Sequence, residues 1–377
     1  MPASRLFTSL LPNRRDFLKS TAGLSSAGAL LLFSPGTSAA AAAMIPAQKQ
    51  TYVDPSTEFL LTRWTEEGAS AQIPAEAQRA IPKGDGRMLY ASDRSGSWQP
   101  YVLQLPKGDS VQLTETEHLH PGSLTFLGNG KELLYLDGNR LVRTQTQRNR
   151  ARTIYEARDG WDFTGEMRVS SDDRSAALVE AKGGDSRVLL ADLVSGKTRT
   201  LFTIRQGVAR LLVLHPQMGV LVANSEGKAS FQGGAAGRKA DAFPDGQVLD
   251  AHLDRQGRKL TYLIRSTGPQ ERVQLMDLDL QTGVHSPIAN TSKFATFVPN
   301  GDGSVFVGAS SSVAQPYLLL LLRVTRREMA LVEHSASAAH MVRPMFSNDS
   351  ETLFFQSDRL GKNIIFSLNL KGLVEKT

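Results

Sequence analysis

The chain contains the sequence SDRSGSWQPYVLQL at residues 92–105 and a close copy, SDRLGKNIIFSLNL, at residues 357–370. Each copy reads as a polar loop, then a strand in which apolar and polar residues alternate, and then a turn. A loop, a strand and a turn that recur in this way are typical of the blades of a β-propeller. The motif therefore predicts an all-β repeat fold.

Short apolar strand cores recur along the chain roughly every 40 to 49 residues, the period of a four-stranded blade. The cores are Met88–Tyr90, Leu133–Tyr135, Ala177–Val179, Val220–Val222, Tyr262–Ile264, Val305–Val307 and Leu353–Phe355. Most follow a turn rich in Gly, Asn or Asp, residues that tolerate the backbone of tight hairpins. Seven copies predict a seven-bladed β-propeller over residues 57–377.

The two ends of the chain complement each other in this arrangement. The last blade supplies strands at about residues 344–347, 352–356 and 364–370, and then lacks a fourth. The segment Phe59–Thr65 resembles an outer strand. Pairing it into the last blade would close the ring and remove two open sheet edges. We therefore expect an N-terminal strand to close the propeller, with residues 44–56 as a linker.

Residues 1–43 have the organisation of an export signal. The pair Arg14-Arg15 is followed by Phe17-Leu18-Lys19, a short apolar run and a tract of small residues ending at Ala43. This order resembles a twin-arginine signal peptide. It predicts a periplasmic or secreted protein. No membrane span is expected after its removal, since Leu318–Leu322 has only the length of a strand.

The composition excludes several classes of function. The formal net charge is +6, and the leader contributes half of it through four basic residues and one acidic residue. No cluster of Lys and Arg with interleaved aromatics is present, so nucleic-acid binding is not expected. The chain has no cysteine, which excludes disulfides, thiol nucleophiles and thiolate metal ligands.

Histidines and arginines fall near the predicted starts of the innermost strands, where a propeller brings distant residues to one channel mouth. His215 is expected to open the fourth blade and His252 the fifth. Residues in such positions can bind a divalent metal or an acidic ligand, or they can be rim residues bonded to backbone. The candidates for ligand binding are Arg79, His118, His120, His340 and Arg343, with His118 and His120 at the i, i+2 spacing of one strand face.

Aromatic residues offer a second kind of contact. Trp161 can stack on the apolar face of a sugar ring, or it can pack between blades. No Gly-x-Ser-x-Gly elbow and no spaced carboxylate pair for glycoside hydrolysis appears.

The Ser-Asp-Arg-x-Gly units resemble the repeats of TolB-type periplasmic propellers. Over most of residues 57–372 the chain more closely resembles the oligogalacturonate lyase family of seven-bladed propellers. The resemblance lies in the runs 61–65, 86–93 and 111–115, then in Gly160-Trp161 and His215-Pro216, all in the same order.

This resemblance implies metal-assisted β-elimination on short oligogalacturonates, with a divalent metal such as manganese as the cofactor. It assigns a catalytic role to His215 and metal ligation to the position of Asp250 and His252, and Arg343 is the candidate for a catalytic cation in place of missing family residues. Two histidines that the family places in its last blade are absent here, where the chain reads Met341-Val342-Arg343.

Two hypotheses of function follow. In the first, the protein is a lyase or a degraded lyase that acts on acidic uronate oligosaccharides. In the second, it is a TolB-like module that binds a periplasmic protein or a glycan without catalysis.

Overall fold

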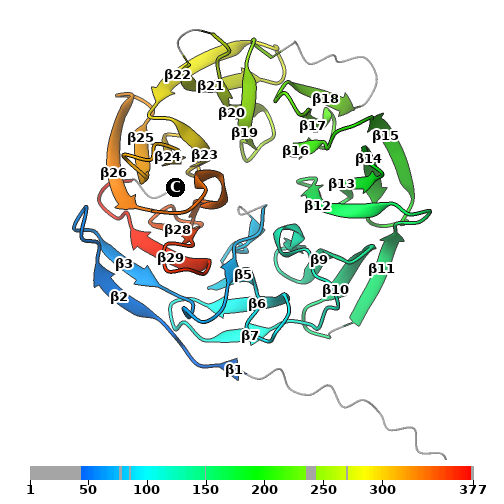
Figure 1. The fold of residues 1–377 in the computed structure, drawn as a ribbon, viewed down its shortest axis with the longest axis horizontal. Helices are drawn as coiled ribbons and strands as arrows, with labels where there is room; N and C mark the ends of the chain where they lie inside the picture. The colour runs from blue at the N-terminus through cyan, green and yellow to red at the C-terminus, as the bar shows by residue number, and fades with distance from the viewer. Residues whose placement is uncertain are drawn as a thin grey trace, which may run out of the picture. The chain divides into compact units, whose positions relative to one another are not determined.

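In the computed structural model, seven antiparallel sheets surround a common axis (Figure 1). It describes residues 44–374 apart from 76–78, 85, 149, 235–242 and 269–270. The leader predicted at residues 1–43 lies outside this range. The predicted all-β, seven-bladed β-propeller is confirmed.

The blades follow one another along the chain. Blade 1 contains β4 (Ala71–Gln72), β5 (Arg87–Ser92), β6 (Gln99–Gln104) and β7 (Ser110–Gln112). Blade 2 contains β8 (Thr125–Leu127), β9 (Glu132–Asp137), β10 (Arg140–Gln145) and β11 (Arg150–Glu156). Blade 3 contains β12 (Asp162–Val169), β13 (Ser175–Lys182), β14 (Asp185–Asp192) and β15 (Thr198–Ile204). Blade 4 has three strands among the described residues, β16 (Arg210–His215), β17 (Gly219–Ala223) and β18 (Ala229–Gly233).

The remaining blades complete the ring. Blade 5 contains β19 (Gln247–Leu253), β20 (Lys259–Arg265), β21 (Val273–Asp279) and β22 (His285–Thr291). Blade 6 contains β23 (Phe294–Pro299), β24 (Val305–Ser310), β25 (Tyr317–Leu322) and β26 (Arg327–Glu333). Blade 7 contains β27 (Met345–Phe346), β28 (Thr352–Ser357) and β29 (Ile364–Asn369), joined by β3 (Leu60–Arg63) and β2 (Gln50–Val53). Two short 3₁₀ turns, η2 (Pro121–Ser123) and η3 (Ala339–Met341), precede β8 and β27.

The second strand of each blade is largely buried. Every residue of β17 and β24 is buried, and so are five of the six residues of β5. These strands have neighbouring blades on both faces, so they read as continuous apolar runs rather than alternating ones. This is why the second strands supplied the repeat visible in the sequence.

The predicted closure of the ring is confirmed. Strand β3 pairs antiparallel with β29, with Leu61 opposite Leu368 and Arg63 opposite Phe366. Figure 1 shows the two strands side by side, although they come from opposite ends of the chain. The indole Nε1 of Trp64 donates a hydrogen bond to the Ser367 hydroxyl at 2.8 Å, also across this junction.

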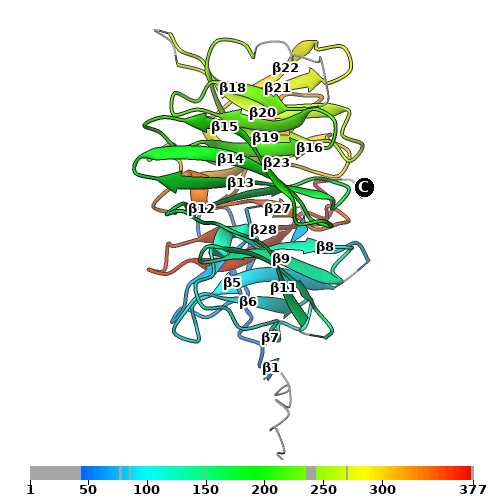
Figure 2. The same cartoon turned by 90° about the vertical axis from the view of Figure 1, so that its right-hand side faces the viewer.

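The segment predicted as a linker, residues 44–56, instead contributes strands to two sheets. Met44 and Ile45 form β1, which pairs with β7 of blade 1, and β2 pairs with β3 of blade 7. Figures 1 and 2 both show β1 beside β7. All four residues of β2 are exposed, so no buried face marks the strand in the sequence. The unpaired edges of β7 and β3 supply the hydrogen bonds that order this segment.

None of the helices in the described part of the chain is long and apolar enough to cross a membrane. The leucine run 318–322 lies in β25, as its length predicted.

Candidate functional site

Charged side chains from four blades meet near the axis of the propeller. They are Glu166 and Arg168 on β12, Arg210 on β16, Asp250 on β19, and Arg343 between η3 and β27. We call these five residues the axial charge cluster. Three guanidinium groups against two carboxylates leave a formal excess of one positive charge. The cluster is therefore suited to an anion.

Like Arg210, whose hydrogen bonds go to the Val248 and Leu249 carbonyls, Arg343 has neutral hydrogen-bond partners. Its Nη1 donates to the Ile73 carbonyl oxygen at 2.6 Å. The orientation of the Gln72 amide that satisfies both groups places its oxygen 2.8 Å from Nη1 and 3.3 Å from Nη2. Burial lowers the pKa of Arg343 to about 10, and Arg168 adds to this effect while Glu166 opposes it. The group is still a cation at neutral pH, and no ion pair to it is found among the described residues.

Glu166, Arg168 and Arg210 link blades 3, 4 and 5. The backbone N–H of Leu211 donates to Glu166 at 3.4 Å, and Arg168 Nε donates to the Leu212 carbonyl at 2.9 Å. The nearest oxygen of Glu166 lies 4.0 Å from Arg168. Arg210 donates to the Leu249 carbonyl at 2.8 Å. Arg210 is an exposed residue, but desolvation of its guanidinium still lowers its pKa. The negative charges of Asp250 and Glu166 oppose this decrease in pKa.

Asp250 and His252 lie side by side on β19. Asp250 Oδ2 accepts from the Thr296 hydroxyl at 2.5 Å and from the Phe297 N–H at 3.2 Å. Burial raises the pKa of Asp250, but His252 and these hydrogen bonds outweigh burial and hold the pKa below its usual value. The carboxylate is therefore ionised at neutral pH.

The donors around Asp250 do not fit the implied manganese site. His252 Nε2 is 3.7 Å from Asp250 Oδ2, yet the same nitrogen is hydrogen-bonded to the Phe297 carbonyl at 2.7 Å. Within residues 44–374, as far as they are described, no three His, Asp or Glu side chains converge. A protein site for manganese normally supplies more than two ligands, so we derive no chemical step through a metal here.

His215 does not lie where the sequence predicted. It ends β16 instead of opening it, because the apolar run 211–214 forms the strand and Pro216 begins the next turn. Its Nε2 bonds to the Gly257 carbonyl at 2.9 Å, and its Nδ1 accepts the N–H groups of Gln217 and Met218. Both ring nitrogens are used within the fold, and Arg210 lies at the other end of the strand.

The fifth-blade histidine departs from prediction in the same way, since His252 is the sixth of seven residues in β19 rather than its start.

Arg79 makes an ion pair with Asp173 and also donates to the Phe126 carbonyl at 3.4 Å. Arg79 lies between β4 and β5, so these contacts join blade 1 to blade 2 and to the β12–β13 turn.

In the described part of the chain, the contacts of the other predicted ligand-binding residues are with groups other than Arg343. His118 is exposed beside Gly138, and His120 Nε2 lies 3.2 Å from the Gly138 carbonyl. The Trp161 ring is covered by Arg187, with the guanidinium carbon 4.3 Å from the ring centroid. His340 is an exposed residue of η3. None of these contacts shows a shared ligand.

The sequence reasoning missed Gln72, Glu166, Arg168, Arg210 and Thr296. Glu166 and Arg168 flank the apolar Met167 within an innermost strand, and Arg210 precedes an apolar run. Charged residues inside a blade's first strand were the signal that could have identified them.

Two cavities lie away from this cluster. One of about 160 Å³ lies between outer strands of blades 5 and 6, and another of about 400 Å³ lies beside β2 and β3. We place the candidate site at the axis because charges from distant blades converge there.

Comparison with known proteins agrees with this fold. No model of a known protein family matches the chain. It is 22% identical over 388 residues to the oligogalacturonide lyase of Pectobacterium atrosepticum, covering 85% of this chain and 96% of that protein. It is also similar to the solved structure of an oligogalacturonate lyase in complex with manganese, with a TM-score of 0.74 and 18% identity over 87% of this chain and 97% of that one.

The oligogalacturonate lyase of Vibrio parahaemolyticus gives a TM-score of 0.77 at 17% identity, over 88% of this chain and 99% of that one. These comparisons confirm the resemblance to oligogalacturonate lyases that the repeats indicated.

Proposed function

We propose that this protein binds short acidic oligosaccharides built from uronate units, and that the axial charge cluster holds their carboxylates. The observation that carries the proposal is Arg343, a guanidinium whose hydrogen-bond acceptors are the neutral groups of Ile73 and Gln72. Arg168 lies close enough to depress its pKa. A carboxylate beside Arg343 would relieve this repulsion and form charge-assisted hydrogen bonds. The resemblance to oligogalacturonate lyases supports uronates as the source of that carboxylate.

We place binding ahead of cleavage. β-Elimination needs a cation against the substrate carboxylate and a base for the proton beside it. Arg343 is suited to the first role. Glu166 is the carboxylate that interacts with Arg343, but it is held by the Leu211 N–H and lies beside Arg168. These contacts hold the carboxylate against its neighbours in blades 3 and 4 instead of leaving it to take a substrate proton, so we expect slow β-elimination.

Binding is tested by calorimetry on the mature protein with trigalacturonate, and with neutral maltotriose as the control. We expect heat and saturation with the acidic sugar only. The same samples, followed by ultraviolet absorbance for the unsaturated product, report β-elimination. Absence of trigalacturonate binding would overturn the proposal, and rapid product formation would put cleavage ahead of binding.

The proposed place of action is the periplasm or the cell exterior, on the basis of the leader at residues 1–43. Replacing the pair, Arg14→Lys with Arg15→Lys, should hold the protein in the cytoplasm, as measured by cell fractionation. Export that is unchanged by this double substitution would contradict a twin-arginine route.

A further inference from the structure

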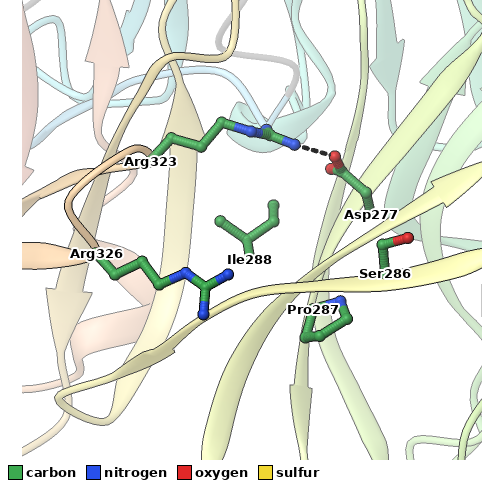
Figure 3. A pocket seen from close by; sticks show the side chains of 6 residues that line it. All are labelled: Asp277, Ser286, Pro287, Ile288, Arg323 and Arg326. Carbon is green, nitrogen blue, oxygen red and sulfur yellow. Dashed lines mark hydrogen bonds and ion pairs between the residues drawn. The ribbon is translucent and has the colours of Figure 1, made fainter.

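The cavity between blades 5 and 6 is lined by residues that no part of the proposed function uses. Its walls are Asp277 on β21, Ser286, Pro287 and Ile288 on β22, and Arg323 and Arg326 from the β25–β26 turn (Figure 3). Its volume is about 160 Å³. That is the space of about five waters at ~30 Å³ each, enough for one small charged group.

The carboxylate in this cavity is fully engaged by the protein. Arg323 forms an ion pair with Asp277 Oδ2, drawn as the dashed line in Figure 3. The Thr261 hydroxyl donates to Asp277 Oδ1 at 2.7 Å. Arg323 also donates to the Gly303 carbonyl at 3.2 Å. Asp277 therefore neutralises Arg323, and each of its two oxygens already has a partner.

Arg326 brings an additional positive charge. Its side chain is exposed, and within the described part of the chain it has no hydrogen bond or ion pair. Figure 3 shows its guanidinium extended toward Ile288 and Pro287, on the side of the cavity that faces β22. The cavity therefore combines one neutralised arginine with one whose charge is not balanced.

The backbone of Arg326 shows that this arginine stands where the repeat favours glycine. In blades 1, 3 and 5 the turn between the third and fourth strands has Gly108, Gly196 and Gly283 at φ of 97°, 73° and 75°. Each glycine N–H bonds to the carbonyl four residues earlier. Arg326 makes the same bond, to Leu322 at 2.8 Å, with φ of 55°. A side chain in this left-handed conformation has an energetic cost that glycine avoids.

From the cavity, the unbalanced charge and the unfavourable backbone together, we infer that Arg326 and Arg323 form a peripheral site for a small oxyanion, a carboxylate or a phosphate group. The guanidinium fork of Arg326 provides two parallel donors for such a group. Pro287 and Ile288 provide an apolar wall for the carbon atoms that carry it. The site lies on outer strands, so it does not depend on the axial charge cluster.

The variant Arg326→Gly tests this site without endangering the fold, because glycine suits the backbone of this turn. Calorimetry on the mature protein uses inorganic phosphate in one series and monomeric galacturonate in the other, so the two series identify the source of the oxyanion. We expect Arg326→Gly to weaken binding of the preferred probe at least tenfold, with an equal or higher Tm. The control Arg205→Gln, which removes an exposed charge from blade 3, should leave binding unchanged.

Arg343→Gln separates this site from the axial one and should leave peripheral binding unchanged. The inference is overturned if neither probe binds, if Arg326→Gly binds like the natural protein, or if Arg205→Gln weakens binding as much as Arg326→Gly. The last result would show that only the diffuse charge of the surface matters.

Discussion

Arg343 Nη1 donates a hydrogen bond of 2.6 Å to the carbonyl oxygen of Ile73, which lies 270 residues earlier in the chain. The bond joins the segment before the innermost strand of blade 7 to the residue that follows the innermost strand of blade 1. The cation of the candidate site is therefore positioned where the last blade, which β3 completes, meets the first blade. Loosening the closure should disturb ligand binding as well as stability.

The first prediction concerns Arg343 as the main anion contact. Arg343→Gln should weaken trigalacturonate binding by about ten- to a hundred-fold, because hydrogen bonds to a charged group contribute about 1.5–3 kcal/mol. Arg150→Gln, which removes an exposed charge at the start of β11, should change affinity little. Calorimetry of the two variants checks this. Equal losses would indicate long-range electrostatics instead of a defined site.

The second prediction concerns the closing strand. Leu61 is fully buried against the last blade, whereas its neighbour Leu60 is 58% exposed. Leu61→Ala should lower the free energy of unfolding by about 2–5 kcal/mol, as large-to-small changes in cores do. Leu60→Ala should change it by less than about 0.5 kcal/mol. Urea denaturation distinguishes them, and equal effects would mean that β3 is not part of the stable core.

The third prediction concerns pH and His334. This residue is buried, and its Nδ1 accepts the Ala336 N–H while its Nε2 bonds to the Ser310 carbonyl. Burial lowers the pKa of His334, with Ser310 and Glu333 opposing the change. In the unfolded chain, His334 binds a proton near its ordinary pKa of about 6.5, whereas in the folded protein it binds the proton only at lower pH. The free energy of unfolding should therefore be highest at pH values above this ordinary pKa, and it should decrease as the pH falls below it.

Tm measured between pH 7 and 5 checks this dependence. His334→Gln should lower Tm at pH 7, since a buried donor loses its acceptor at a cost of about 1–3 kcal/mol, and should flatten the decline with acid. His340→Gln, at an exposed position of η3, should keep the decline of the natural protein. The same slope in all three proteins would assign the pH dependence to other groups.

The fourth prediction concerns manganese. A ligand that binds only the folded state at a hundred times its Kd stabilises it by about 2.7 kcal/mol. Because Asp250 and His252 supply two donors, and no group of three such ligands is found in the described part of the chain, we expect manganese chloride or a chelator to shift Tm by less than about 1 °C. A rise in Tm with manganese that His252→Ala abolishes would show that these residues do form a metal site.

The blades and their closure could be predicted from the amino-acid sequence. The second strands 88–90 and 353–355 are apolar because blades cover both their faces, and that burial is a local property visible in a run of residues. The strand at 60–63 was predictable because the last blade ended one strand short. The segment 44–56 was not, because β2 has no buried face and is ordered only by the open edge of β3.

The sequence did not predict which side chains meet at the axis, because that depends on how the blades are arranged in three dimensions. The pairing of β12 with β13 shifts between Phe163 and Met167, so the residues between them, Glu166 included, depart from simple alternation. A shift of one residue in register turns side chains to the opposite face, and the sequence does not show where it occurs. His215 was predicted at a strand start and lies at a strand end, because the apolar run before it forms the strand. Arg168, Arg210 and Arg343 became one site only when seven strands were arranged around one axis, since each arginine alone resembles an ordinary surface charge.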